Sequence, residues 1–220
     1  DDVFPHTTPT GNTYDSGRYL YALETAAELA DYESLRAEQA ERRARGDRNQ
    51  LGIGIASYVE ITAGGSSEEY AAVTVHQDGS ATIAAGTAAH GQGHATSYAM
   101  IVSSATGIPM DRITHVDGDT DLLPRGGGTG GSRSLQLGGS AVVGARDALI
   151  DRARSIAAQQ LEADVTDIVI DVSTGSFHVA GVPSTVLSWS DIAQHVEADG
   201  EQLSADHVFN QNGATFPFGA

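Results

Sequence analysis

A chain of 220 residues is long enough for one sizeable domain or two small ones, and folding would bury roughly two thirds of the unfolded surface. Acidic residues outnumber basic ones 29 to 12, no lysine occurs, and the formal net charge of −17 argues against nonspecific binding to nucleic acid. Cysteine is absent, which excludes disulfides, iron–sulfur ligation and cysteine nucleophiles within this chain, and no apolar run approaches the roughly 20 residues that cross a bilayer.

The first 50 residues are predicted to form an irregular lead-in followed by helices that pack on a domain formed by residues 51–220. Residues 1–15 are rich in Thr, Pro, Gly and Asp, which is typical of irregular structure. Asp15 is a candidate N-cap for a first helix. The residues that follow it at helical spacing are Tyr19, Leu23, Ala26 and Ala30.

A second helix is predicted over residues 32–45, with Asp31 as its N-cap and Gly46 as its end. Glu38 and Arg42, like Glu41 and Arg45, stand four residues apart, a spacing that favours ion pairs along a helix surface. This helix is therefore expected to lie mostly at the surface.

From residue 51 the apolar pattern changes to that of strands, first over residues 51–64 and then on both sides of Asp78-Gly79. Asp-Gly between alternating strands predicts a hairpin with a two-residue type I′ turn. A helix is expected from His94 to Thr106, ended by Gly107, and a short strand over residues 112–118.

A long helix is predicted near residues 134–162, and Gly138, Gly139 and Gly144 within it would let another backbone approach closely. Its apolar stripe consists of Val142, Ala145, Leu149, Ala153 and Ile156. The long helix is followed by a predicted hairpin over residues 167–179 and a predicted helix over residues 188–198. Ser188 and Asp191 form a capping box at the start of that helix. This order predicts an α+β fold, a two-layer arrangement in which a mixed sheet packs against helices.

The first glycine loop, residues 87–94 ("TAAHGQGH"), lies between a predicted strand and a predicted helix. The amides of Gly91, Gln92, Gly93 and His94 are therefore expected to be unpaired at a helix N-terminus, where free N–H groups and the helix dipole favour an anion. His90 and His94 are four residues apart, but two glycines between them disfavour a continuous helix and hence a metal site. A structural role and a ligand-facing role for these histidines both remain open.

The second glycine loop, residues 125–134 ("RGGGTGGSRS"), contains five glycines and leads into the long helix. Bare amides, hydroxyl groups, an arginine and a helix terminus come together here, which favours a phosphate or pyrophosphate site over a flexible linker. Neither loop matches the Walker A pattern or the dinucleotide-binding fingerprint. We expect the two loops to lie side by side and to face one anionic ligand.

No nucleophile and base pair stands out, and the Asp117, Asp119 and Asp121 cluster lacks the later glutamate of a calcium loop. These aspartates are expected to serve in turns and caps, with weak metal binding as the alternative. The chain starts at Asp1 and closes on "ATFPFGA", where Phe216 and Phe218 look like the beginning of an extended, half-buried segment. We expect the sequence to be a piece of a longer protein.

The segments "GQGHATSYAMIVSSATGIP" and "GDTDLLPRGGGTGGSRSLQLGGSAV", at this spacing, resemble the molybdenum-binding large subunit of the xanthine dehydrogenase and aldehyde oxidase family, nearest to carbon monoxide dehydrogenase large subunits. "TYDSGRYLYALETAAELADYESLRAEQAERR" and "LGIGIASYVEIT" resemble the preceding segments of such subunits, and the resemblance weakens after about residue 165. It implies one lobe of a molybdenum cofactor-binding domain.

The implied cofactor is molybdopterin, in its cytosine dinucleotide form, carrying molybdenum; its dithiolene holds the metal, so no protein metal ligand is expected. The cofactor-binding residues implied by the resemblance are Gly91, Gln92, Gly93, His94, Thr129, Ser132, Arg133, Ser134 and Gln136. We expect Gln92→Ala and Arg133→Ala to lower molybdenum content without changing the melting temperature.

The resemblance also implies a cytoplasmic oxidoreductase that oxidises or hydroxylates a small molecule with water as the oxygen source. Its expected partners are the rest of the large subunit and iron–sulfur and FAD subunits or domains, in an oligomer without membrane insertion. The family's catalytic glutamate motif and the cysteine loop of carbon monoxide dehydrogenases are absent from these 220 residues, so no catalytic residue is assigned and the chain alone is expected to be inactive. Two alternatives remain. One is a non-catalytic module for a phosphorylated ligand, and the other is a metal-dependent hydrolase built on His90 and His94.

Overall fold

The computed structural model describes residues 3–65 and 67–220, and internal contacts divide them into two compact units. The first unit runs up to Thr62 and includes Ala214–Ala220, and the second unit is Ala63–Gly213. Residues 51–62 and 214–220, which the sequence analysis assigns to the second domain, thus make their contacts in the first unit. The domain boundary near residue 50 stays a prediction.

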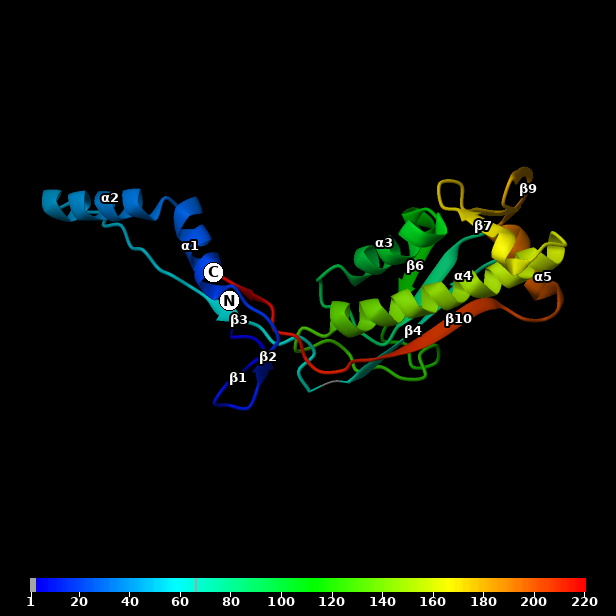
Figure 1. The fold of residues 1–220 in the computed structure, drawn as a ribbon, viewed down its shortest axis with the longest axis horizontal. Coiled ribbons are helices and arrows are strands. Elements are labelled where there is room, and N and C mark those ends of the chain that lie inside the picture. The colour runs from blue at the N-terminus through cyan, green and yellow to red at the C-terminus, as the bar shows by residue number, and fades with distance from the viewer. Residues whose placement is uncertain (1–2, 66) are drawn as a thin grey trace. The chain divides into compact units, whose positions relative to one another are not determined.

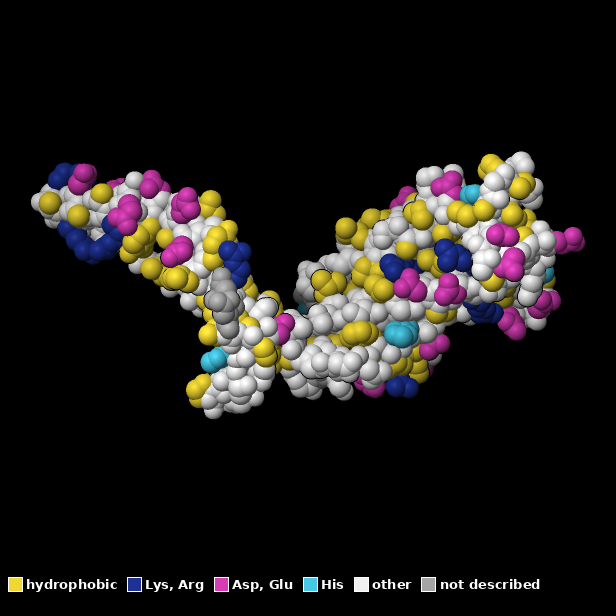
Figure 2. Space-filling view, viewed as in Figure 1, with side chains coloured by type: hydrophobic (Ala, Val, Ile, Leu, Met, Phe, Trp, Pro, Cys, Tyr) yellow, Lys and Arg dark blue, Asp and Glu magenta, His cyan; other side chains and the backbone are white. Residues whose placement is uncertain are grey.

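The first unit consists of two helices and two small antiparallel sheets. Its helices are α1 (Tyr19–Leu29) and α2 (Tyr32–Arg45). Strand β1 (His6–Thr7) pairs with β2 (Thr13–Tyr14), and β3 (Tyr58–Val59) pairs with β11 (Phe218–Gly219). The ion pairs predicted along α2, Glu38–Arg42 and Glu41–Arg45, are present, and Figure 2 shows acidic and arginine side chains next to one another there.

Two predictions for the first unit were wrong. Helix α1 has Arg18 rather than Asp15 as its N-cap. The ring of Tyr19, the first residue of the helix, packs edge-on against Phe4 and Phe218, with centroid distances of 5.8 and 5.0 Å. The strand expected over residues 51–64 is reduced to β3, with its pairing continued from Glu60 and Thr62 to residues 215–217. An apolar pattern forms a strand only where a partner strand lies alongside, and here that partner is the far end of the chain.

The second unit is built on a four-stranded mixed sheet, as predicted. Its strands are β4 (Glu68–Val75), β5 (Ala81–Ala85), β6 (Ile113–Val116) and β10 (Leu203–Asn210), in the spatial order β10-β4-β5-β6. Strands β5 and β6 are parallel, joined through α3 (His94–Thr106) and the short 3-10 helix η1 (Met110–Arg112), and the other pairs are antiparallel.

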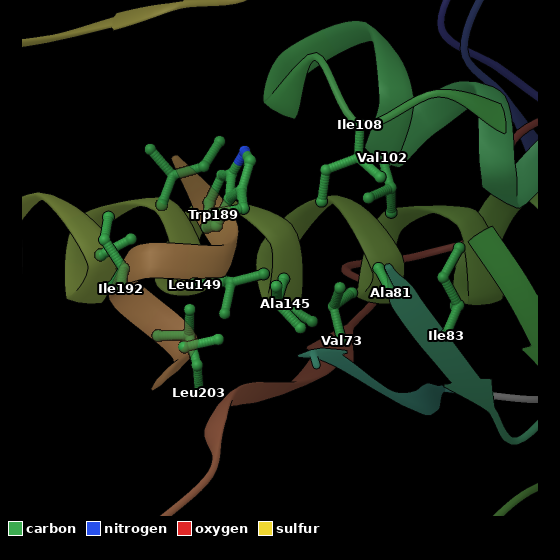
Figure 3. Close-up of a cluster of buried hydrophobic side chains, with 14 of the residues drawn as sticks. Val73, Ala81, Ile83, Val102, Ile108, Ala145, Leu149, Trp189, Ile192 and Leu203 are labelled. Carbon is green, nitrogen blue, oxygen red and sulfur yellow. The ribbon is translucent and has the colours of Figure 1, made fainter. Parts of the chain in front are cut away.

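Helices form the second layer, which confirms the predicted two-layer arrangement. Helix α4 (Ser140–Gln160) lies along β4 and β10, and α3 lies beside β6 (Figure 1). The long helix was predicted to start at residue 134, but Ser134–Gly139 forms a π-helical segment, η2, before α4 begins. Alternate strand residues such as Val73 and Ile83 are fully buried and meet Ala145 and Leu149 of α4 in one core (Figure 3).

A three-stranded antiparallel sheet and helix α5 complete the second unit. The strands are β7 (Ile168–Asp171), β8 (Ser176–Val179) and β9 (Val182–Ser188), and the 3-10 helix η3 (Val165–Asp167) precedes them. Helix α5 (Trp189–Ala198) begins with the predicted capping box of Ser188 and Asp191. Strands β9 and β10 were not predicted individually.

The hairpin of β4 and β5 is confirmed, but its predicted type I′ turn is wrong. Three residues, Gln77, Asp78 and Gly79, form the loop: the N–H of Gly79 donates to the carbonyl of His76, and the N–H of His76 donates to that of Ser80. Only Gly79, with φ of 78°, has a positive φ, whereas a type I′ turn needs two such residues. No helix in the described part of the chain is long and apolar enough to cross a membrane.

Candidate functional site

The two glycine loops lie against each other in the second unit, as predicted. Because β5 and β6 are parallel, the loops that follow them start from the same edge of the sheet. The N–H of Gly128 donates to the carbonyl of Gly86 at 3.0 Å, and the hydroxyl of Thr129 donates to the carbonyl of Ala88 at 2.6 Å. Segments some 40 residues apart in sequence therefore form one surface.

The first glycine loop presents a row of free amides. The N–H groups of residues 91–96 find no acceptor among the described residues, and they stand at the N-terminus of α3. Gly91 and Gly93 have φ values of 96° and 83°, and a Cβ on either would have no atom within 4 Å. The exposed Gln92 turns back, and its Oε1 accepts the N–H of His90 at 2.5 Å. Such a loop can admit an anion close to its backbone.

His94 lies beneath this loop rather than on its surface. Its side chain is buried, its ring stacks on Tyr98 at a centroid distance of 5.3 Å, and His115 lies edge-on at 6.4 Å. Neither ring nitrogen of His94 has a hydrogen-bond partner among the described residues. Burial, together with the nearby His90, lowers the pKa of His94, while Asp117 opposes that shift. The imidazole is therefore held neutral at neutral pH.

Asp117 and Tyr98 connect the loops to the sheet and helix, and sequence reasoning assigned neither to the site. Asp117 Oδ2 accepts the N–H of Ala89 at 2.8 Å and lies 3.9 Å from Nδ1 of His115. Burial and the nearby His94 lower the pKa of His115, which Asp117 opposes. The hydroxyl of Tyr98 bonds with Thr87 Oγ1 at 2.8 Å and donates to the carbonyl of Ser134 at 2.9 Å, so it joins both loops.

In the second glycine loop, the amides are free while two hydroxyl groups are engaged. The N–H groups of residues 129–131 have no acceptor among the described residues. Thr129 and Ser134 share a hydrogen bond of 2.8 Å between their hydroxyls. These side chains brace the loop, and the backbone remains available to a ligand.

Arg133 lies below the second loop, in a buried ion pair. Its Nη2 is 2.9 Å from Oε2 of Glu69 and donates to the carbonyl of Glu68 at 2.8 Å. The exposed fractions of Arg133 and Glu69 are only 7% and 2%. Glu69 stands at an inward position of the alternating pattern of β4, a signal that the sequence analysis missed.

The remaining residues of the second loop lie nearer the surface. Ser132 is exposed with φ of 55°, and Gln136 is half-buried in η2. A cavity of about 410 Å³ opens between the end of β5 and residues 118–128. The exposed Arg125 lines it together with Gly86 and Gly128, whereas residues 91–94 and 129–131 do not line it. Among the described residues, no group of three His, Asp or Glu side chains is arranged to hold a metal ion. The arrangement suits a phosphate-bearing ligand held mainly by backbone amides.

Comparison with known proteins identifies relatives along most of the chain. A family model described as a molybdopterin cofactor-binding domain matches residues 25–220. The carbon monoxide dehydrogenase large chain of Hydrogenophaga pseudoflava is 37% identical and aligns with 99% of this chain. The nicotine 6-hydroxylase large subunit of Paenarthrobacter nicotinovorans is 32% identical over 92% of it. The chain spans 29% and 26% of the lengths of these two proteins.

Solved structures show the same fold. Carbon monoxide dehydrogenase from Oligotropha carboxidovorans matches 99% of this chain with a TM-score of 0.79 and 33% identity. Quinoline 2-oxidoreductase from Pseudomonas putida 86 matches 98% with a TM-score of 0.79 and 28% identity. In both comparisons the chain covers 29% of the matched chain.

Proposed function

Because this chain belongs to the molybdopterin cofactor-binding domain family, we propose that it forms one lobe of the cofactor site in the large subunit of a molybdenum hydroxylase. The family membership confirms the resemblance predicted from the loop motifs. The observation that carries the proposal is the contact of the two glycine loops, each of which has amides without an acceptor among the described residues.

The residues present fit a phosphate-bearing pterin. Backbone N–H groups of Gly91, Gln92, Gly93 and His94 would bind it from one side, and the amide of Thr129 from the other. The exposed Ser132 and the half-buried Gln136 are further candidates for contacts with the ligand, whereas the hydroxyls of Thr129 and Ser134 bond to each other within the loop. The cytosine dinucleotide form is part of the proposal and rests on the family resemblance, while the two glycine loops support binding of the phosphate groups.

When bound, molybdenum would supply the redox chemistry by which a small molecule is oxidised or hydroxylated with water as the oxygen source. The part of the described residues is to bind and orient the pterin and its phosphates. The chain spans under a third of the length of these relatives. The proposal for the complete protein therefore also includes the substrate, the iron–sulfur and FAD partners, an oligomeric assembly and a cytoplasmic location.

Cofactor content of the complete protein tests this function. We expect the purified protein to contain molybdenum and to release a cytidine nucleotide on acid hydrolysis. Gln92→Ala should lower the molybdenum content per chain about threefold to tenfold, because the first glycine loop loses the hydrogen bond that Gln92 Oε1 accepts from the His90 N–H and holds its ligand-binding amides less firmly. The matched control is Gln194→Ala, an exposed glutamine of α5, and it should leave the content unchanged.

A protein that binds inorganic pyrophosphate but carries no molybdenum or pterin, even when made in a host that assembles this cofactor, would contradict the enzyme proposal. That result would favour the alternative of a non-catalytic module for a phosphorylated ligand. Full molybdenum content in Gln92→Ala would remove Gln92 from the site.

A further inference from the structure

The second glycine loop covers a buried carboxylate that has no role in the proposed ligand contacts. Glu69 Oε2 accepts from Nη2 of Arg133 at 2.9 Å and from the N–H of Gly127 at 3.4 Å. Its Oε1 accepts the N–H of Tyr70 at 3.0 Å. Both carboxylate oxygens are therefore engaged, and one of them bonds directly to the loop.

The loop fits closely over this ion pair because it is made of glycine. A Cβ on Gly127 would lie 1.6 Å from Nη1 of Arg133. A Cβ on Gly86 would lie 2.2 Å from Oε1 of Glu69 and 2.6 Å from the Cα of Gly126. Any side chain at Gly86 or Gly127 would displace the ion pair or the loop.

A loop with five glycines needs an anchor other than side-chain packing. Glycine loses more conformational freedom on ordering than other residues do, and it buries no side chain in return. The ion pair contacts the loop at Gly127 and at Arg133, on either side of residues 128–132. Among those intervening residues, the N–H groups of residues 129–131 have no acceptor among the described residues.

We propose that Glu69 is the positioning residue of the second glycine loop: through Arg133 and Gly127 it fixes both ends of residues 128–132 so that the amides of residues 129–131 face the ligand. Glu69 does not itself touch the ligand. The identity of that ligand rests on the proposed function, whereas the ordering of the loop does not.

Hydrogen exchange, thermal unfolding and molybdenum content of the complete protein test this role. In Glu69→Gln, the amides of Gly127 and Gly128, which are hydrogen-bonded in the wild-type protein, should exchange about tenfold faster and molybdenum content should fall, while β5 keeps its protection. The melting temperature should also fall, because Arg133 is left buried without its counter-charge. In the double variant Glu69→Leu with Arg133→Met, an apolar pair replaces the ion pair. The melting temperature should then recover, while the fast exchange and low molybdenum content persist.

Leu149→Ala is the control, since it destabilises the core of the same unit away from the loop. It should leave exchange of the Gly127 and Gly128 amides and molybdenum content unchanged well below its melting temperature. Wild-type exchange in the double variant, or equally fast loop exchange in Leu149→Ala, would overturn the role of Glu69. If the wild-type protein carries no molybdenum but the loop still loosens in Glu69→Gln, the proposed function fails and the positioning role stands.

Discussion

At the scale of single residues, Gly138 shows how a close approach dictates a residue type. A Cβ there would lie 2.6 Å from the hydroxyl of Tyr98 and 2.9 Å from Cγ2 of Thr87. Both side chains are buried and hydrogen-bonded to each other, so they cannot move aside freely. The glycine thus allows η2 to lie against the start of the first loop.

Gly138→Ala should therefore lower the free energy of unfolding by about 1–3 kcal/mol, the usual effect of overpacking a filled core. Gly130→Ala is the matched control, because its Cβ would meet no atom within 4 Å and its φ is not positive. Chemical denaturation of both variants measures the difference. Equal stabilities would show that the contact at Gly138 relaxes without strain.

Burial of His94 and His115 predicts a pH dependence of stability. Burial lowers the pKa of both side chains below their ordinary value of 6.5. The unfolded chain therefore binds protons more readily than the native one as the pH falls below 6.5. The stability from these groups is complete above pH 6.5 and is lost as the pH falls toward their lower native pKa values.

The midpoint of urea unfolding at about pH 7.5 and about pH 5.5 measures this effect, and we expect a lower midpoint at the acid pH. His115→Gln should reduce the difference, whereas His195→Gln, at an exposed position of α5, should not. The pKa values of Asp78 and Asp191 are lowered by hydrogen bonds from Ser80 and Ser188. These carboxyl groups therefore change the pH dependence of stability only near pH 4 and below. Identical midpoints for the wild-type protein would contradict the prediction.

Arg133 is the residue for which the structure changes an expectation most. From sequence, Arg133→Ala was expected to spare the melting temperature, as for a ligand-facing side chain. The ion pair with the buried Glu69 instead predicts a loss of stability, because an unpaired buried carboxylate would remain. Gln92 is exposed, so unchanged stability stays the prediction for Gln92→Ala.

At the scale of elements, α5 is the helix whose start is most clearly encoded. Ser188 Oγ accepts the N–H of Asp191 at 3.2 Å, and Asp191 Oδ2 accepts the N–H of Ser188 at 2.8 Å. The next residue, Trp189, is buried and donates its Nε1–H to the carbonyl of Thr106 at 2.8 Å, which attaches α5 to the end of α3. A local cap and a tertiary contact thus fix the same helix terminus.

Ser188→Ala should reduce the free energy of unfolding by about 1 kcal/mol through loss of this cap. Ser155→Ala, on the exposed side of α4, should change it by less than about 0.5 kcal/mol. Thermal or chemical unfolding distinguishes the two. A cost for Ser188→Ala no larger than that of the control would mean that packing of Trp189 alone sets the helix start.

At the scale of the whole molecule, the formal charge of −17 means that the excess acidic side chains repel one another. Dissolved salt screens this repulsion. Acidic side chains are scattered over the face seen in Figure 2, with arginines among them. Raising the salt concentration from about 0.05 M to about 0.5 M should therefore stabilise the fold by on the order of 1 kcal/mol, or about 2–4 °C in melting temperature. Calorimetry at the two concentrations measures this, and a lower melting temperature at high salt would contradict it.

The sequence by itself determined the elements whose signals are local. The capping box of α5, the glycine ends of α2 and α3, and the alternation of β4 and β5 each depend on residues within a few positions of one another. The two loop motifs were recognisable for the same reason, since their glycines and helix starts are adjacent in the chain.

Only the tertiary structure decided which strands and ion pairs form between residues that are far apart in the sequence. Residues 51–57 have a strand pattern without a partner, while β10 forms because β4 offers an edge some 130 residues earlier in the chain. Arg133 could not be assigned to its ion pair from sequence, because Glu69 is brought beneath the loop by the pairing of β4 with β5. Charges and sheet edges are satisfied by neighbours in space, and linear spacing does not reveal which neighbours those are.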